Sequence, residues 1–291
     1  MRRFCAAIIA AVALNASAVS AELKLNLSSN TFWEVDAPWF GGFSALEMAS
    51  DGRAATFITD RGMLVAAQIK REAGKITSID ITKQTLLRDA AGIPFADRVH
   101  DAEGLAIGAQ GRAFVSFEFE HRVRALNRDT GMTQNLPNHP EFDGLPINKG
   151  LEALAIDAQG TLFALVELRQ QGQDITPLYR FKDGQWTISH RIPLNAPFVP
   201  VGADIAEDGW LYLLERTVTP LGFRSRLRRF DLNADPMPSE ILITTFPALF
   251  DNLEGLSVWT DSTGATRLTM VSDDNFLPIQ RTQVVEYILT E

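Results

Sequence analysis

Apolar residues in this chain come as short runs or alternations broken by Gly, Asp and Pro, a pattern typical of β-strands. After Glu22 almost no stretch has the periodicity of a helix. The pattern predicts strands in five groups: 45–48, 54–59, 63–69 and 76–87; 105–107, 113–119, 122–126 and 132–136; 154–156, 162–167, 178–181 and 186–192; 203–206, 210–215, 225–231 and 241–246; and 256–259, 267–272 and 283–289. The chain is therefore expected to be an all-β protein.

A short phrase recurs at the start of these groups. It consists of an acidic residue, a small residue and a leucine, followed by a glycine turn and a second strand that ends in an acid. The clearest copies begin at Glu103, Glu152 and Glu254, and weaker copies begin at Ser44 and Val201. Successive copies start 59, 49, 49 and 53 residues apart. A propeller blade, which is a four-stranded sheet, takes about 40 to 50 residues.

The fifth group has three predicted strands, one fewer than a blade needs. Residues 23–27 alternate between apolar and polar side chains and belong to no repeat. We expect this N-terminal strand to pair with the C-terminal repeat, because such closure of the ring removes unpaired sheet edges. The sequence thus predicts a β-propeller of four-stranded blades, five by repeat count, with a sixth possible if one repeat has lost its pattern.

The first residues predict a secretory signal peptide. Arg2 and Arg3 precede an apolar run over 6–14 that is too short to span a bilayer, and small residues follow up to Ala21. Cleavage after Ala21 would separate the signal, 1–21, from one propeller domain, 22–291. Cys5 would leave with the signal, so the mature protein would have no disulfide. We expect a periplasmic or secreted protein, with Sec and twin-arginine export both open.

The chain is acidic, with a formal net charge of -9 over 291 residues. Without Arg2 and Arg3 the charge is -11 (-9 minus 2). No nucleic-acid partner is expected, because proteins that track a phosphate backbone need a basic patch. The charge is compatible with cation binding or simply with solubility. Because no other stretch could form a stable membrane span, we expect a soluble exported monomer.

Acidic residues open and close the repeated phrases. They are Asp60, Glu103, Glu118, Glu152, Glu167, Glu215, Glu254 and Asp273, with Asp274 beside the last. The two strands of each phrase form a hairpin, so the start of the first lies beside the end of the second, away from the glycine turn. The first strand of a propeller blade usually lines the central channel. We therefore expect the acids on one rim near the axis.

Carboxylates in a ring repel one another. The sequence leaves open three ways to reduce this repulsion: raised pKa values, arginine partners or a bound cation. Arg61 and Arg216 directly follow closing acids, and Arg122 lies just beyond Glu118. Arginine can clamp a carboxylate or a phosphate. Calcium takes oxygen ligands, whereas zinc is less expected because the four histidines do not cluster. Inter-blade salt bridges that merely hold the ring together are an equal alternative.

The chain resembles the phytase-like family, also described as esterase-like activity of phytase, over residues 40–289. The similarity is carried by Gly41-Gly42-Phe43-Ser44-Ala45-Leu46, Asp60-Arg61-Gly62, Glu103-Gly104-Leu105, Glu118 with Arg122-Val123, Glu152-Ala153-Leu154, Leu214-Glu215-Arg216, Asn252-Leu253-Glu254-Gly255-Leu256 and Ser272-Asp273-Asp274-Asn275-Phe276. The resemblance implies an exported propeller with recurring acids, suspected of phosphoester or related ester hydrolysis. It does not extend to histidine-phosphatase phytases, whose Arg-His-Gly motif is missing, and gives no ground for phytate as substrate.

These observations lead to the hypothesis of an exported, metal-assisted hydrolase of phosphate mono- or diesters that acts on a small anionic ester. The catalytic candidates are Glu103, Glu118, Glu152, Glu254 and His100, and the substrate-binding candidates are Arg61, Arg122 and Arg216. The candidate ligands of a divalent cation, with calcium favoured, are Asp60, Glu103, Glu152, Glu167, Glu215, Glu254, Asp273 and Asp274. The alternatives are a non-catalytic binding or scaffold propeller and a calcium-dependent lactonase-like ester hydrolase, so enzymatic activity itself is left open.

Overall fold

Within residues 23–95, 101–168 and 174–290, which the computed structural model describes, twenty strands form five four-stranded antiparallel sheets. Blade 1 contains β2 (Phe43–Met48), β3 (Ala54–Thr59), β4 (Met63–Glu72) and β5 (Lys75–Leu86). Blade 2 contains β6 (Ala102–Ile107), β7 (Ala113–Phe117), β8 (Arg122–Leu126) and β9 (Thr133–Asn135). Blade 3 contains β10 (Ala153–Ile156), β11 (Leu162–Leu165), β12 (Ile175–Lys182) and β13 (Gln185–Pro193).

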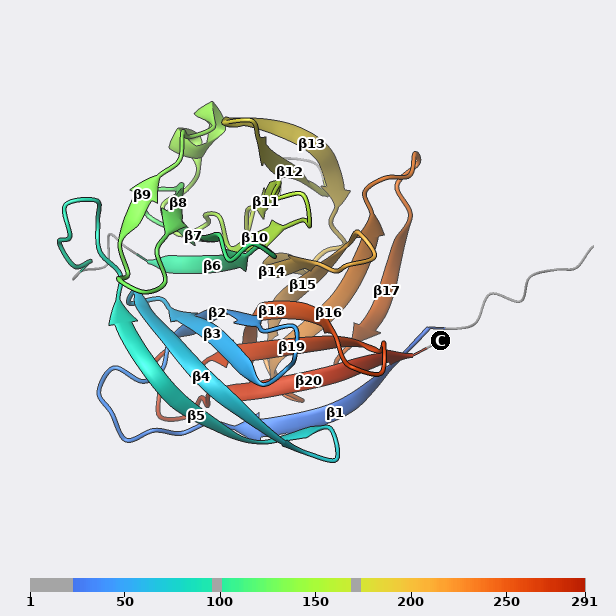
Figure 1. Ribbon diagram of the computed structural model, residues 1–291. Coiled ribbons are helices and arrows are strands. Elements are labelled where there is room, and N and C mark those ends of the chain that lie inside the picture. Colours follow the sequence, from blue (N-terminus) through green and yellow to red (C-terminus); the bar gives the residue numbers. More distant parts are fainter. Residues whose placement is uncertain (1–22, 96–100, 169–173, 291) are drawn as a thin grey trace, which may run out of the picture.

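Blade 4 contains β14 (Val199–Ile205), β15 (Trp210–Thr219), β16 (Gly222–Asp231) and β17 (Ser239–Thr244). Blade 5 contains β18 (Asn252–Thr260), β19 (Thr266–Asp273), β20 (Gln283–Thr290) and β1 (Lys24–Phe32). The blades surround a central axis, with β2, β6, β10, β14 and β18 innermost (Figure 1). The predicted all-β propeller is confirmed, and the described residues form five blades.

The N-terminal segment closes the ring as the sequence predicts. β1 pairs antiparallel with β20, from Lys24 opposite Thr290 to Phe32 opposite Gln283. It is the outermost strand of blade 5 (Figure 1). Closure therefore joins the two ends of the domain in one sheet and leaves no gap between the last and first blades.

The predicted strands correspond to observed strands in every blade, and the differences lie at their ends. β15 and β16 extend as a hairpin beyond the predicted end at residue 215, because their ladder continues to the pair Thr219 and Gly222. β11 ends at Leu165, two residues before Glu167, because Leu165 is its last residue paired with β10. The closing acid therefore stands just past the ladder, at the rim.

Little regular helix accompanies the sheets. A short 3-10 helix, η2 (Pro140–Gly144), lies in the connection between blades 2 and 3. Across the residues that the structure describes, no helix is long and apolar enough to span a membrane. The core consists of apolar clusters packed between and within the blades, such as Phe43, Phe57 and Trp33 around blade 1.

Glycine serves two different purposes in the repeated phrase. The turn glycines Gly52, Gly111, Gly160, Gly209 and Gly264 have φ values between +67° and +84°, which side chains disfavour. Gly202 and Gly255 lie instead where inner strands of neighbouring blades meet. An added Cβ would come within 2.3 Å of the Glu254 carbonyl oxygen at Gly202, and within 2.8 Å of the Ala45 Cα at Gly255. The inner strands can approach this closely only without side chains at these positions.

Gly202→Ala is expected to lower the free energy of unfolding by roughly 1 to 3 kcal/mol, because no rotamer change moves a Cβ away from the opposing backbone. Gly144→Ala is the matched control, since Gly144 is exposed and an added Cβ there meets nothing within 4 Å. Denaturant midpoints at an unchanged slope measure the difference. A Gly202→Ala protein as stable as the Gly144→Ala protein would contradict the tight contact.

Candidate functional site

A β-bulge interrupts the inner strand of four blades at the residue that opens the phrase. The register against the second strand slips near Ser44, Glu103, Val201 and Glu254. In blade 3 the opening acid, Glu152, directly precedes the inner strand. A bulge bends the strand and redirects a side chain, and bulges are common beside active sites. Except for Val201, these side chains line one axial cavity.

This axial cavity has a volume of about 220 Å³, and all five blades contribute to its lining. The lining contains eight carboxylates: Asp60, Asp101, Glu103, Glu118, Glu152, Glu167, Glu254 and Asp273. Arg216, Ser44, Asn148 and Asn275 complete it. The structure therefore brings together most of the acids that the sequence placed on one rim. Asp101, Asn148 and Asn275, which are not among the candidate site residues of the sequence, belong to it as well.

Glu215 does not line the cavity. It pairs with Pro200 in the β14–β15 ladder, in the register position that Thr59 occupies in blade 1. Its side chain is fully buried, and its two carboxylate oxygens accept from Arg226 Nε at 2.5 Å and Arg228 Nη1 at 3.2 Å. Because both of its oxygens bind arginines outside the cavity, Glu215 is not a cation ligand of the cavity.

Arg216 takes the place in blade 4 that an acid takes in the other blades. Successive side chains of a strand point to opposite faces, so the residue after Glu215 points to the axis. The Arg216 guanidinium binds Glu254, donates to Glu167 Oε1 at 3.1 Å and donates to Asn252 Oδ1 at 2.6 Å. Arg216 thereby joins blades 3, 4 and 5, and its donors are directed at protein acceptors.

Asp274 and Arg122 lie outside the cavity lining. Asp274 Oδ1 accepts from the backbone N–H groups of Gly42 and Phe276, both at 3.0 Å. The Asp274 carboxylate therefore ties the backbone at Gly42 to the backbone at Phe276, beside the cavity. The Arg122 guanidinium, at the start of β8, lies 4.8 Å from the Phe117 ring centroid and pairs with Glu120 of the preceding turn at 3.1 Å.

Arg61 is exposed beside Asp60, and its guanidinium lies 3.3 Å from the Phe276 ring centroid. A cation held over an aromatic face keeps its N–H donors at the edge free to meet an anion. His100, the predicted general acid or base, lies outside the described residues.

Burial and mutual repulsion raise the pKa values of several cavity acids. Burial is the largest cause, and neighbouring carboxylates add to it. The pKa rises to about 6 for Asp60, about 7 for Asp101 and about 8 for Asp273. The pKa values of Glu103 and Glu152 are raised well above the ordinary range, again first by burial. At neutral pH the cavity therefore favours protons or another positive charge.

The residues of the cavity fit a hard divalent cation. Asp101, Glu103 and Glu118 each offer an oxygen, and these oxygens all lie within 4.8 Å of one another. Asp60 Oδ1 is buried and has no hydrogen-bond partner among the described residues. The group consists of carboxylates, which suit calcium or magnesium better than zinc. An unpartnered buried acceptor beside clustered acids is what a cation site needs.

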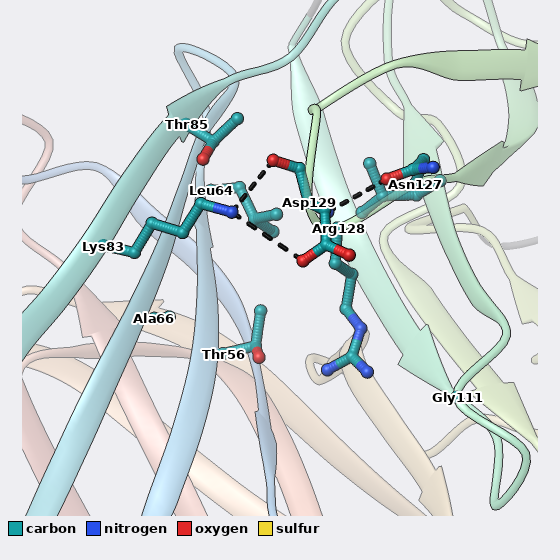
Figure 2. Close-up of a pocket in the computed structure, with 10 residues that line it drawn as sticks. Thr56, Leu64, Ala66, Lys83, Thr85, Gly111, Asn127, Arg128 and Asp129 are labelled. Carbon is teal, nitrogen blue, oxygen red and sulfur yellow. Dashed lines mark hydrogen bonds and ion pairs between the residues drawn. The ribbon is translucent and has the colours of Figure 1, made fainter.

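A larger pocket of about 500 Å³ lies between blades 1 and 2 and shares no lining residue with the axial cavity. Figure 2 shows Lys83 reaching from β5 to the β8–β9 turn, where its Nζ donates to the Asp129 carbonyl oxygen at 2.9 Å. Arg128 and Thr56 face the same space (Figure 2). The clustered acids of the axial cavity make that cavity the stronger candidate.

The model of the phytase-like family, described as esterase-like activity of phytase, matches residues 38–276. The chain belongs to this family. Among curated proteins, none matches the sequence.

Solved structures similar to this chain include three proteins of low sequence identity. Regucalcin from Agrobacterium tumefaciens str. C58, described as a calcium-binding protein, is 10% identical with a TM-score of 0.48, over 84% of this chain and 90% of that chain. A luciferin-regenerating enzyme is 11% identical with a TM-score of 0.45, over 87% and 93% of the two chains. The aldose sugar dehydrogenase from Streptomyces coelicolor is 15% identical with a TM-score of 0.43, over 86% and 80%. We draw no function from these likenesses.

With divalent cations chelated, the melting temperature is expected to fall as pH rises from about 5 to about 8. The folded pKa values of Asp60, Asp101 and Asp273, about 6 to 8, lie above the unfolded value near 4. In that window the native state binds more protons than the unfolded state, so the free energy of unfolding decreases with pH. Asp273→Asn should make the fall shallower. Asp80→Asn, at an exposed ion pair with Lys70, should leave it unchanged. A flat wild-type profile would contradict the raised pKa values.

Proposed function

We propose that this phytase-like propeller is a metal-assisted hydrolase of phosphate mono- or diesters, with its site in the axial cavity. The observation that carries the proposal is an imbalance of charge. Outside the cavity, the fully buried Glu215 and Glu286 are each matched by two arginines. Among the described residues, the cavity lining has eight carboxylates and one arginine. Ion pairs that merely hold blades together would not leave this excess of negative charge.

We assign Asp101, Glu103 and Glu118 to hold the cation, because their carboxylate oxygens already lie within 4.8 Å of one another. A bound divalent cation would lower the pKa of a water and polarise a phosphoryl oxygen. Gly150 N–H donates to Glu118 Oε1 at 2.9 Å and fixes that carboxylate. Calcium is the cation that we favour, because the donors are all oxygens and their number is large.

Three further residues have roles around this group. Asp60, whose buried Oδ1 has no partner among the described residues, is our candidate to accept a proton from the attacking water. Arg61, exposed beside it, is our candidate to bind the anionic substrate. Arg216 orients Glu254 and Glu167 through its hydrogen bonds, so we assign it the role of positioning these two acids.

A non-catalytic binding propeller is the second candidate. The observation in its favour is the network around Arg216, which ties three blades together through Glu167, Asn252 and Glu254. In that case a cation would stabilise the ring without any turnover. Substrate tests on the calcium-loaded protein distinguish the two, and a lactone in the substrate panel covers lactonase-like ester hydrolysis.

Calcium is expected to raise the melting temperature of the chelator-treated protein at about pH 7.5, because a ligand that binds only the native state stabilises it. Glu103→Gln should abolish most of this rise and lower hydrolysis of generic phosphomonoester and phosphodiester substrates at least about a hundredfold. Glu34→Gln is the matched control, because Glu34 is exposed and remote from the cavity lining. A Glu103→Gln protein that keeps wild-type turnover would refute the site. Calcium stabilisation without turnover of any substrate would favour the binding propeller.

A further inference from the structure

Arg61 lies at the edge of the axial cavity with its side-chain donors uncommitted. Asp60, the residue before it, lines the cavity, and burial raises the pKa of Asp60 while the nearby Arg61 charge lowers it. Within the part of the chain that the structure describes, no hydrogen bond or ion pair engages the Arg61 guanidinium. Arg216, by contrast, donates to three side chains of the protein. Arg61 is therefore the arginine beside the cavity that can still bind an anion with two N–H groups.

The ring of Phe276 fixes the Arg61 guanidinium in place. The guanidinium carbon lies 3.3 Å from the ring centroid. The other arginine–ring contacts among the described residues measure 4.2 to 5.7 Å. A guanidinium stacked on a ring face keeps its N–H groups at the edge, and a side chain that is already ordered loses less entropy when an anion binds. The stack thus prepares Arg61 for binding.

The backbone at Phe276 adopts a conformation that a phenylalanine normally avoids. The φ angle is +49° at Asn275 and +51° at Phe276, both in the left-handed region. Asparagine tolerates this region, whereas for a bulky residue it is an outlier that the surrounding structure must hold. Such strain clusters at functional sites. Asn275 lines the cavity, so the strained pair begins in the cavity wall and ends beneath Arg61.

Contacts from blades 1 and 5 hold the strained turn. Asp274 Oδ1 accepts from the N–H groups of Phe276 and Gly42, both at 3.0 Å, and Thr282 Oγ1 donates to Asp274 Oδ2 at 3.0 Å. An added Cβ would come within 3.1 Å of the Phe276 ring at Gly41 and within 2.6 Å at Gly42. The ring therefore occupies space that side chains at these two positions would fill. Its position is set by these contacts as well as by Arg61.

We propose that Phe276 is a positioning residue, whose ring holds the Arg61 guanidinium at the cavity edge so that it binds the phosphate group of the substrate. Arg61 and Phe276 directly follow two residues of the cavity lining, Asp60 and Asn275, so the stack lies beside the acids proposed to hold the cation. This inference rests on the proposed function, because it takes Arg61 as the group that binds the substrate anion. If Phe276 only packs the loop, its effect does not depend on Arg61.

Titration calorimetry with methylphosphonate, a phosphomonoester analogue without an ester bond, measures anion binding by the calcium-loaded protein without turnover. Phe276→Leu keeps an apolar side chain but removes the ring, so it should raise the Kd about fivefold, the loss of one cation–π contact. Arg61→Gln should raise the Kd at least about tenfold. In the Arg61→Gln background, Phe276→Leu should cause no further loss, because the ring acts through the guanidinium. With a hydrolysable ester, Phe276→Leu should raise KM and leave kcat unchanged.

Three further variants complete the test, and melting curves establish that each variant is folded. Phe276→Tyr keeps the ring and should bind within about twofold of the wild type, whereas Phe276→Met, a second variant without a ring, should behave as Phe276→Leu does. Phe32→Leu is the matched control and should bind as the wild type does. Phe32 is 50% exposed, has the Arg281 guanidinium 5.2 Å from its ring centroid and does not line the cavity.

The outcomes separate this inference from the proposed hydrolysis. Wild-type affinity in Phe276→Leu, additive losses in the double variant, or a wild type that binds no methylphosphonate would overturn the role of Phe276. Coupled losses of affinity without turnover of any ester would support that role and refute hydrolysis. Turnover of esters with an unchanged KM in Phe276→Leu would refute the role of Phe276 alone.

Discussion

Two carboxylates about 5 Å apart repel by roughly 3 kcal/mol at an effective dielectric of 20, and the axial cavity holds eight carboxylates. The molecule answers this repulsion in part with protons, which the raised pKa values of Asp101 and Asp273 retain near neutral pH. Arg216 supplies one fixed positive charge. A divalent cation would supply the rest. The Asp60 oxygen that has no partner among the described residues is consistent with that need.

The fold holds the cavity acids close together despite their mutual repulsion. Inner strands reach the axis because glycines such as Gly202 and Gly255 remove the side chains that would keep them apart. Bulges in the same strands then place Glu103 and Glu254 in the cavity. Outside the cavity, the fully buried Glu215 and Glu286 each bind two arginines. Among the described residues, Arg216 is the arginine that pairs with acids of the cavity.

Sequence periodicity was enough to predict the blades and their closure by the N-terminal strand, because strand alternation and repeat length are local signals. It could not place every site residue. Glu215 and Arg216 are neighbours that face opposite ways, and only the ladder register decides which one points to the axis. Asn148 lies in a loop between blades, where no repeat pattern marks it.

Titration calorimetry of calcium into chelator-treated protein, in two buffers of different ionisation enthalpy, tests the central claim most directly. The claim is that a cation replaces protons among the cavity acids. At about pH 7 we expect binding with release of about one proton or more per ion, because the pKa values of Asp101 and Asp273 are about 7 and about 8. Absence of binding, or binding whose heat is the same in both buffers, would contradict the account.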